Sequence, residues 1–362
     1  MARVPTNARV VRRIGRIFDV AAIALAIAVK TFTPSEQWVE AHYANGAYPV
    51  IDRVVRTFTR PLPFTLGDVL FVIAVVLLVR YWIVSFRRRT GGIVRTSVAV
   101  VVRTFAVSSA IFVWFVFSWG YGYSRIPIAD KVPVHNERTD EDSVGHFADR
   151  VNDELTRYAD PAHAEHLSDE DFEQRLVPRF EATIARLGDD ATFAPPRIKP
   201  TMFQPMLQAS ATTGFTDPFT HEVNVDASLF FFERPSVYAH EWAHLSGFND
   251  ESEANFISVI TCTTSPDPEL KYSGWLLVWE NLPSDVKLTH KMGKTAYDDL
   301  TAIRARYARN VNKQVEHASQ AAYNQYLKSN HVKAGYASYR LFIRWMTGAD
   351  FDATGLPIVR PV

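Results

Sequence analysis

The stretch His240-Glu241-Trp242-Ala243-His244 decides how this sequence is interpreted. On a helix, residues four apart lie on one face, so both imidazoles can reach one metal ion. Glu241 directly follows His240 and can point into the same cleft, where a carboxylate can take the proton of a metal-activated water. The pattern therefore predicts metal-assisted hydrolysis, most often of a peptide bond.

The residues around the motif predict two consecutive helices. Pro235 is favoured in the first turn of the motif helix, and Gly247, three residues after His244, is a natural stop. After the turn, a second helix is expected over 250–263, with several acidic residues near its start. The motif is therefore expected on one helix, with further ligands available from the next.

A catalytic zinc site normally has three protein ligands and an open position for water, so a third ligand is needed. Asp250 is the best N-cap of the second helix, although it also occupies the position of the last histidine in the metzincin pattern. Glu253 would complete a capping box with it. Glu251 has no such structural role, and it lies one helical turn before Asn255, which could support it. We therefore prefer Glu251 as the third ligand, with Glu253 and then Asp250 as alternatives.

The remaining elements are predicted from periodicity. Residues 219–225 alternate like a strand, and an edge strand before the metal helix pairs with the substrate backbone in many zinc peptidases. His221 and Glu222 are not a second metal motif, because Val225 occupies the i+4 position. Other helices are expected over these ranges: 144–158, 169–187, 296–328 and 336–346.

Three apolar runs in the first third of the chain predict membrane spans near 17–33, 67–86 and 98–120. The first run is short and contains Ala24-Leu25-Ala26, so a cleaved signal peptide is a rival to the uncleaved anchor that we prefer. Arg80 and Arg103 are expected to snorkel to the membrane surface. Core helices of a soluble protein are the other alternative, which the length and basic flanks of the runs oppose.

The basic residues predict the orientation of these spans. The loop between the second and third runs is rich in arginine, as is the N-terminus, which places both in the cytoplasm: Arg87, Arg88, Arg89 and Arg95. Segment 34–64 and everything after about residue 121 then lie outside the cytoplasmic membrane. Segment 34–64 reads as one or two amphipathic helices on the outer membrane surface, or as a lid packed on the soluble domain.

Composition limits the classes of partner and site. The net charge is zero, which gives no reason to expect nucleic acid. The lone Cys262 excludes an intrachain disulfide and a cysteine-based zinc site. We expect a membrane domain over 1–124 and an extracytoplasmic domain over 125–362, mainly α-helical α+β and zincin-like with a small sheet.

The sequence resembles a bacterial membrane-anchored family of unknown function that is itself similar to gluzincin-type zinc metallopeptidases. The resemblance covers most of the chain. It rests on residues 240–248 and 251–256 and on shorter matching pieces: 119–125, 218–220, 272–274, 326–330 and 338–339. In gluzincins the third ligand is a glutamate with Asp or Asn four residues later, so the resemblance implies Glu251 supported by Asn255.

Gluzincins usually add a residue that stabilises the oxyanion, and the resemblance implies one here. The candidates are Tyr272, His290, His317, Tyr323, Tyr339 and Arg340. The resulting hypothesis is a membrane-anchored zinc metalloendopeptidase with ligands His240, His244 and Glu251 and general base Glu241. Its expected partners are the lipid bilayer and a peptide or protein substrate of the cell envelope. The alternatives are a non-proteolytic zinc amidohydrolase of the envelope, or a pseudoenzyme that acts as a sensor or scaffold.

Overall fold

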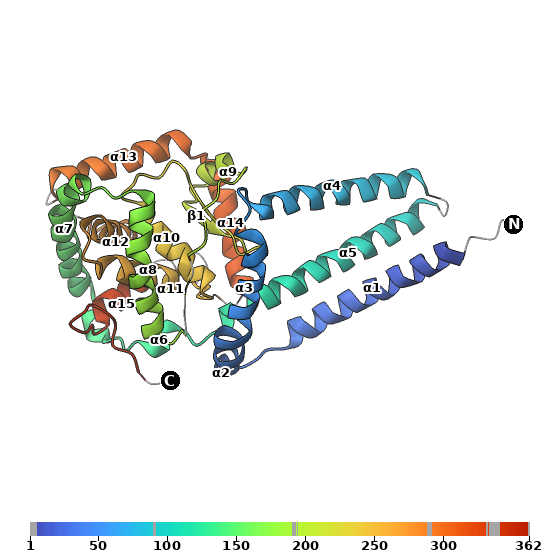
Figure 1. The fold of residues 1–362 in the computed structure, drawn as a ribbon, viewed down its shortest axis with the longest axis horizontal. Helices are drawn as coiled ribbons and strands as arrows, with labels where there is room; N and C mark the ends of the chain where they lie inside the picture. Colours follow the sequence, from blue (N-terminus) through green and yellow to red (C-terminus); the bar gives the residue numbers. More distant parts are fainter. Residues whose placement is uncertain are drawn as a thin grey trace.

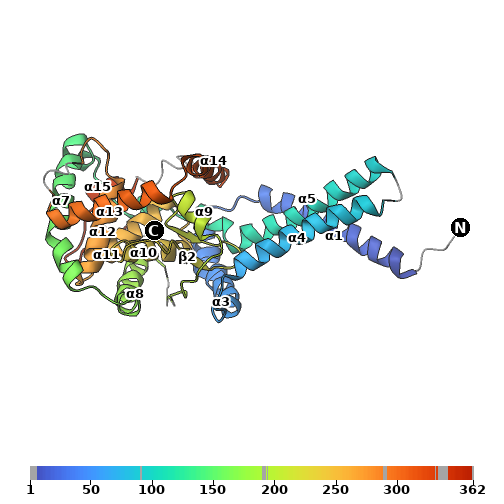
Figure 2. The same ribbon diagram turned by 90° about the horizontal axis from the view of Figure 1, so that it is seen from above.

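The computed structural model of the protein describes residues 6–89, 92–189, 193, 195–287, 292–330, 332 and 341–360. These residues are mostly helical, with one two-stranded sheet. Three long helices project from one side of a rounded helical body, and the described N-terminus lies at their far end (Figures 1 and 2). The mainly helical character and the small sheet are as predicted.

The projecting helices are α1 (Thr6–Thr31), α4 (Leu66–Arg87) and α5 (Ile93–Ser118). Helices α4 and α5 are long and apolar enough to cross a membrane, with mean hydropathies of 2.5 and 2.0. Residues Arg13–Thr31 of α1 and the helical segment Glu36–Thr59 pass the same test together, bent by 115° at the break between them. The described chain therefore has two helices of spanning length, or three if the bent pair counts as one.

Helices α1 and α5 are joined by an ion pair within their apolar length. Arg103 of α5 lies 3.1 Å, from Nε to Oδ1, from Asp19 of α1. A charged side chain between apolar helices is stabilised by a partner of opposite sign. Arg103 was predicted to reach the membrane surface, whereas in the structure it pairs with an aspartate of the neighbouring helix.

The body consists of helices packed around two central ones. The central pair is α10 (Arg234–Leu245) and α11 (Glu251–Thr263). The other elements of the body are η2 (Gly120–Ser124), α6 (Ile128–Lys131), η3 (Asn136–Arg138), α7 (Glu141–Ala164), α8 (Asp169–Arg186), α9 (Gln204–Ala209), α12 (Pro268–Asn281), α13 (Lys294–Asn310), α14 (Lys313–Ser329) and α15 (Phe342–Gly348). Every residue from Glu251 to Cys262 is buried, so α11 forms the centre of the core.

Two predicted helices differ from the structure. The single helix expected over 296–328 is two helices, because Asn312 ends the continuity between α13 and α14. Its side chain caps α14 by accepting from the N–H groups of Gln314 and Val315, and its own N–H donates to Ala209. The helix expected over 336–346 falls partly outside the described residues, and the described part belongs to α15.

The sheet has two short strands, and it differs in extent from the single strand predicted over 219–225. Strand β1 (Gly214–Thr216) pairs antiparallel with β2 (Val223–Val225). The prediction of a strand over the whole of 219–225 is wrong for 219–222. There the chain turns, with His221 at a φ of 53°, and the His221 N–H donates to the Asp217 carbonyl. In this turn His221 contacts Asp52 and the Ser118 carbonyl, and Glu222 accepts from the start of α4.

Segment 34–64 packs on the body. It contains α2 (Glu36–Trp38), the π-helix η1 (Val39–Ala47) and α3 (Tyr48–Thr59). The Tyr48 hydroxyl donates to the Leu245 carbonyl of α10, and Glu40 pairs with Arg125 and Lys131. The opposite side of α3 is exposed and apolar, with Val50, Val54 and Phe58. Segment 34–64 thus packs on the body, as predicted for a lid, and it also has the exposed apolar face predicted for an amphipathic helix on the membrane surface.

Buried polar contacts bind the projecting helices to the loop that carries the sheet. Glu222 accepts the N–H groups of Leu66 and Gly67 at the start of α4, and it pairs with buried Lys199 at 2.6 Å. His221 contacts Asp52 Oδ1 through Nδ1 at 3.0 Å and the Ser118 carbonyl through Nε2 at 3.2 Å. Helix α3, the start of α4 and the end of α5 are therefore held against one loop of the body.

Candidate metal centre

Helix α10 presents two different faces because of the order of its residues. Trp242, Ala243 and Leu245 lie in the main hydrophobic core. His240 and His244 are four residues apart and share another face. Pro235 lies in the first turn, and Gly247, at a φ of 83°, ends the helix in a left-handed conformation that favours glycine. The helix limits therefore match those predicted from Pro235 and Gly247.

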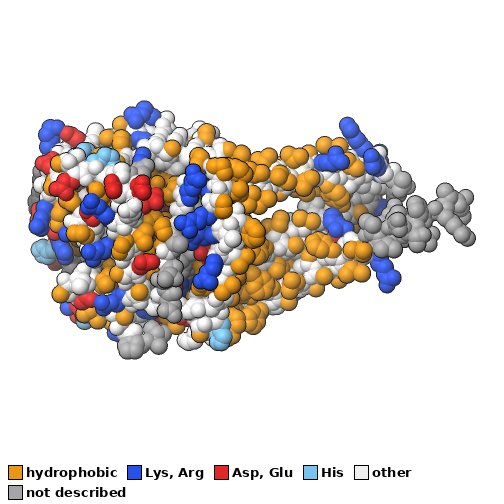
Figure 3. Space-filling view, in the orientation of Figure 1, with side chains coloured by type: hydrophobic (Ala, Val, Ile, Leu, Met, Phe, Trp, Pro, Cys, Tyr) orange, Lys and Arg blue, Asp and Glu red, His pale blue; other side chains and the backbone are white. Residues whose placement is uncertain are grey.

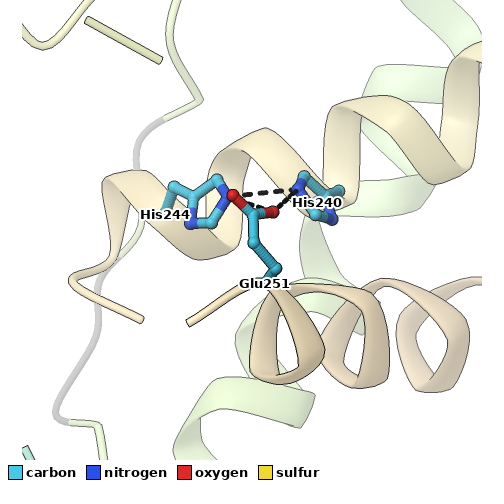
Figure 4. A group of neighbouring side chains, drawn as sticks. All are labelled: His240, His244 and Glu251. Atoms are coloured by element: carbon cyan, nitrogen blue, oxygen red, sulfur yellow. Dashed lines mark hydrogen bonds and ion pairs between the residues drawn. The ribbon is translucent and has the colours of Figure 1, made fainter. Parts of the chain in front are cut away.

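The structure brings His240, His244 and Glu251 together (Figure 4). Glu251 Oε2 lies 3.2 Å from His240 Nε2 and 3.4 Å from His244 Nε2, and the two Nε2 atoms are 3.1 Å apart. The side chain of Glu251 is 2% exposed and those of the histidines 14% and 10%. Three ligand atoms from two helices thus converge in a largely buried place.

The hydrogen bonds of the two Nδ1 atoms determine which nitrogen of each neutral ring carries the hydrogen. His244 Nδ1 lies 2.8 Å from the Phe248 carbonyl oxygen, and His240 Nδ1 lies 2.8 Å from Asn255 Oδ1. Both oxygens accept, so each Nδ1 carries the hydrogen, and each neutral ring presents a lone pair at Nε2. Glu251 Oε2 is buried, and the two Nε2 atoms face it. Three lone pairs therefore face one point, an arrangement that suits a cation.

The spacing of these atoms also fits zinc. Zinc binds nitrogen and oxygen at about 2.0–2.2 Å in tetrahedral geometry, which places neighbouring ligand atoms about 3.3 Å apart. The three observed separations range from 3.1 to 3.4 Å. Two imidazoles and one carboxylate are also the donor set of many catalytic zinc sites. The residues present therefore fit the metal implied by the sequence.

The charges within the cluster reinforce one another. Burial alone would lower the pKa of His244, but Glu251 outweighs it and raises that pKa to about 9. At neutral pH the metal-free His244 therefore carries a second proton at Nε2, and a bound cation would replace that proton. Burial alone would raise the pKa of Glu251, but the two histidines hold it well below its ordinary value. The cluster is thus built around a carboxylate that stays ionised and attracts positive charge.

The other two acids considered as third ligands have different partners. Asp250 caps α11 and accepts from the N–H groups of Ser252 and Glu253. Glu253 Oε1 accepts from the Ile128 N–H at 2.7 Å, and burial together with Asp250 raises the pKa of Glu253 to about 7. The predicted cap is present, while the glutamate of the expected capping box binds α6 instead. Glu251 is the acid that the fold places beside the histidines.

Glu241 is held by the strand that precedes it. Its Oε2 accepts from the Thr216 hydroxyl at 2.6 Å, and burial raises the pKa of its carboxyl, an effect that the histidines partly offset. A Cβ atom at Gly214 would lie 2.3 Å from Glu241 Oε1, so only glycine leaves room for this carboxylate. Strand β1 therefore positions Glu241 in two ways: Thr216 donates a hydrogen bond to it, and Gly214 leaves space for it.

Among the six candidates for oxyanion stabilisation, the structure brings Tyr323 to the cluster. Its hydroxyl donates to Glu251 Oε1 from helix α14. The Tyr272 hydroxyl is bonded to Asp299, and His317 is exposed, six residues before Tyr323 and so on another side of the helix. The remaining three candidates lie outside the described residues: His290, Tyr339 and Arg340.

The site lies where the projecting helices meet the body. Trp119 directly follows α5, and its ring is 6.3 Å from that of His244. Tyr326 of α14 packs on Phe115 of α5, and its hydroxyl accepts a 3.1 Å hydrogen bond from Tyr123. The cluster is thus enclosed by α10, α11, α14 and the end of α5.

Residues 43–347 match the model of the family described as "Protein of unknown function (DUF3810)". The chain belongs to this family. The matched segment begins in η1, ends in α15 and includes α4, α5 and all residues of the cluster. No curated protein and no solved structure matches the chain. A division at residue 124 stays a prediction, and the matched segment runs through that point.

Sequence reasoning missed Thr216 and Gly214. The face of β1 that carries them lies against Glu241. A strand of three residues between turns has no sequence pattern that shows which helix it will contact. The one available signal was the turn-rich stretch Gly214–Pro218 directly before the predicted strand, which is typical of a hairpin. A hairpin would have placed 213–217 beside 222–226.

Proposed function

We propose that this member of the DUF3810 family is a membrane-anchored zinc-dependent hydrolase, a gluzincin-type metallopeptidase with a zincin-like catalytic region. One observation carries the proposal: three lone pairs from His240, His244 and Glu251 converge beside Glu241. A scaffold would have no need for this buried His-His-Glu cluster, whereas catalytic zinc needs such a ligand set and a nearby base.

The residues of the cluster would divide the work of hydrolysis. When bound, zinc would polarise the scissile carbonyl and an attacking water. Glu241 would take the proton of that water and deliver it to the leaving amine. The Thr216 hydroxyl would orient the Glu241 carboxylate, and the Tyr323 hydroxyl, which donates to Glu251 Oε1, would orient that ligand.

The proposed location is the outer side of the cytoplasmic membrane, with several spans and a cytoplasmic N-terminus. The support is the distribution of arginine: Arg87, Arg88, Arg89 and Arg95 lie around the turn between α4 and α5. This turn is at the end of the helices far from the body, where Figure 3 shows basic side chains. Because basic loops stay in the cytoplasm, the body would lie outside.

The test uses the full chain in lipid nanodiscs, as wild type and as Glu241→Gln and His240→Ala variants. Metal content is measured by mass spectrometry, and cleavage is measured on peptide libraries and on envelope amides. Stoichiometric zinc in the wild type and in Glu241→Gln, with peptide cleavage by the wild type only, is expected. His240→Ala should lose both zinc and activity. A wild-type chain that binds no zinc would contradict the proposal, and cleavage restricted to non-peptide amides would contradict its peptidase form.

A further inference from the structure

Exposed apolar side chains of the body are concentrated in one stretch of the chain. Seven large apolar side chains are exposed in the described part of residues 125–362. Four of them lie between 202 and 219, and we call these the rim patch: Met202, Met206, Phe215 and Phe219. Their exposed fractions range from 38% to 62%. Scattered apolar residues are ordinary on a surface, whereas a gathered patch marks a site of contact.

The rim patch is continuous with the two most apolar helices. Phe203, which follows Met202 of the patch, packs edge-on against Phe71 of α4, and the Phe219 ring lies 6.1 Å from the Phe115 ring of α5. The Trp114 indole N–H of α5 donates to the Phe219 carbonyl at 3.2 Å. In Figure 3 the apolar surface of the projecting helices continues onto the adjoining edge of the body.

The depth of these contacts along the helices is informative. Phe71 is the sixth residue of α4, about 7.5 Å along the helix from Leu66 at a rise of 1.5 Å per residue. Phe115 lies about 4.5 Å before the end of α5 by the same measure. The rim patch thus lies beside the outermost turns of the spans, not beyond their ends. If α4 and α5 cross a bilayer, the occupant of this surface is the outer leaflet of that same bilayer.

The rim patch also borders the candidate metal centre. Phe215 is the central residue of β1, between Gly214 and Thr216, which both face Glu241. On a strand, neighbouring side chains point to opposite sides, so Phe215 points out where they point in. From the other direction, Trp119 at the end of α5 lies against His244. Residues next to the rim patch and directly after α5 therefore contact the candidate metal centre, which places this centre close to the membrane surface if α4 and α5 are spans.

From these contacts we propose that the rim patch is embedded in the outer leaflet, and that the site acts on the juxtamembrane segment of membrane-anchored polypeptides. This substrate class rests on the proposed peptidase function. A segment beside its own membrane anchor lies at the level of the site, while a segment far from the membrane would have to return to the bilayer surface. Confinement in one membrane also raises the effective concentration of substrate at the site.

The depth of the rim patch is tested without reference to activity. Spin labels are attached to Met206→Cys and, as a matched control, to Lys294→Cys, whose native side chain on α13 is 87% exposed. The wild-type chain is the blank, since Cys262 is fully buried. In lipid nanodiscs, the label at 206 should be relaxed by oxygen, which concentrates in lipid, and the label at 294 by a water-soluble nickel chelate. Nickel relaxation at both positions would overturn the proposal.

The substrate class is tested with an anchored reporter in proteoliposomes. Its outer segment of about 40 unstructured residues spans far more than the distance from the bilayer to the site. Cut positions are mapped by mass spectrometry for this reporter and for the same segment without its anchor, with Glu241→Gln as the control enzyme. Cuts within about ten residues of the anchor are expected, with the free segment cut at least about tenfold more slowly.

The same experiment separates the two hypotheses. Cuts spread along the whole segment, or equal rates for the anchored and free forms, would overturn the juxtamembrane preference and leave the peptidase function intact. A zinc-loaded wild type that cuts neither form would overturn the peptidase function itself, and with it this inference. A Met206→Glu variant should lose the preference for the anchored form, while Tyr297→Glu, an exposed apolar position on α13, should retain it.

Discussion

Gly214 controls the space available to the Glu241 carboxylate. A Cβ at this position would lie 2.3 Å from Oε1 and 2.8 Å from the carboxyl carbon, which are contacts that real Cβ atoms do not make. The Glu241 side chain has little room to yield, because it is buried and bonded to Thr216. A single methyl group would therefore displace the proposed general base.

Gly214→Ala is expected to lower hydrolysis by roughly 100-fold, since a positioned general base contributes about 10²–10⁴-fold. Zinc content should not change, because the ligands lie on other residues. The rate and the metal content are measured on the same preparation. Gly145→Ala in α7 is the control, because its Cβ would meet open space. Unchanged hydrolysis in Gly214→Ala would show that Glu241 is not the base in this geometry.

Glu251 and Glu253 form a second matched pair at this scale. Glu251→Gln should lose more than about 100-fold in zinc affinity, because even residues that only support ligands contribute about 10–100-fold. Glu253→Gln should keep its zinc, since the amide oxygen can still accept from the Ile128 N–H. Competition with a chelator of known affinity measures both. Equal loss in the two variants would contradict the assignment of Glu251 as the ligand.

At the scale of elements, α10 and α11 follow from local signals. Pro235, Gly247 and Asp250 begin and end these helices as predicted, because first-turn prolines, stops and caps act over three or four residues. The strand predicted over 219–225 is present only at 223–225. His221 and Glu222 fit an alternating pattern, but their side chains bind α3, the start of α4 and the end of α5, and only the folded chain reveals those partners.

Substitution of Glu222 at the junction between α4 and the body is expected to lower the stability of the protein strongly. Glu222→Ala leaves buried Lys199 without its carboxylate and two N–H groups at the start of α4 without an acceptor. Breaking a buried pair in this way should lower the free energy of unfolding by about 3–5 kcal/mol. Chemical denaturation in detergent micelles measures the change.

Lys313→Ala is the control for the junction. Its ion pair with Glu316 on α14 is largely exposed, and such pairs contribute little to stability. A loss of stability in Glu222→Ala no larger than that in the control would show that the pair does not hold α4 to the body.

The basic turn and the candidate site lie at opposite ends of the projecting helices α4 and α5. Arg88 lies at the turn between α4 and α5, and Lys294 lies on the body. A membrane-impermeant maleimide should therefore label Lys294→Cys in intact spheroplasts and Arg88→Cys only after permeabilisation, since basic loops stay inside. Buried Cys262 adds no background. The reverse labelling pattern would contradict an extracytoplasmic site.

The sequence by itself determined the local features of this protein. The i, i+4 spacing of His240 and His244 places both rings on one face, and the length of the apolar runs predicts α4 and α5. These are properties of a single helix, and they depend only on near neighbours along the chain.

Only the tertiary structure decided which distant residues meet the motif. Thr216 lies 25 residues from Glu241, Tyr323 lies 72 residues from Glu251, and Trp119 comes from the end of α5. Such contacts depend on how all the helices pack together, and no periodicity in the sequence records that packing. For the same reason, the position of the cluster at the level where the spans end became visible only in the folded chain.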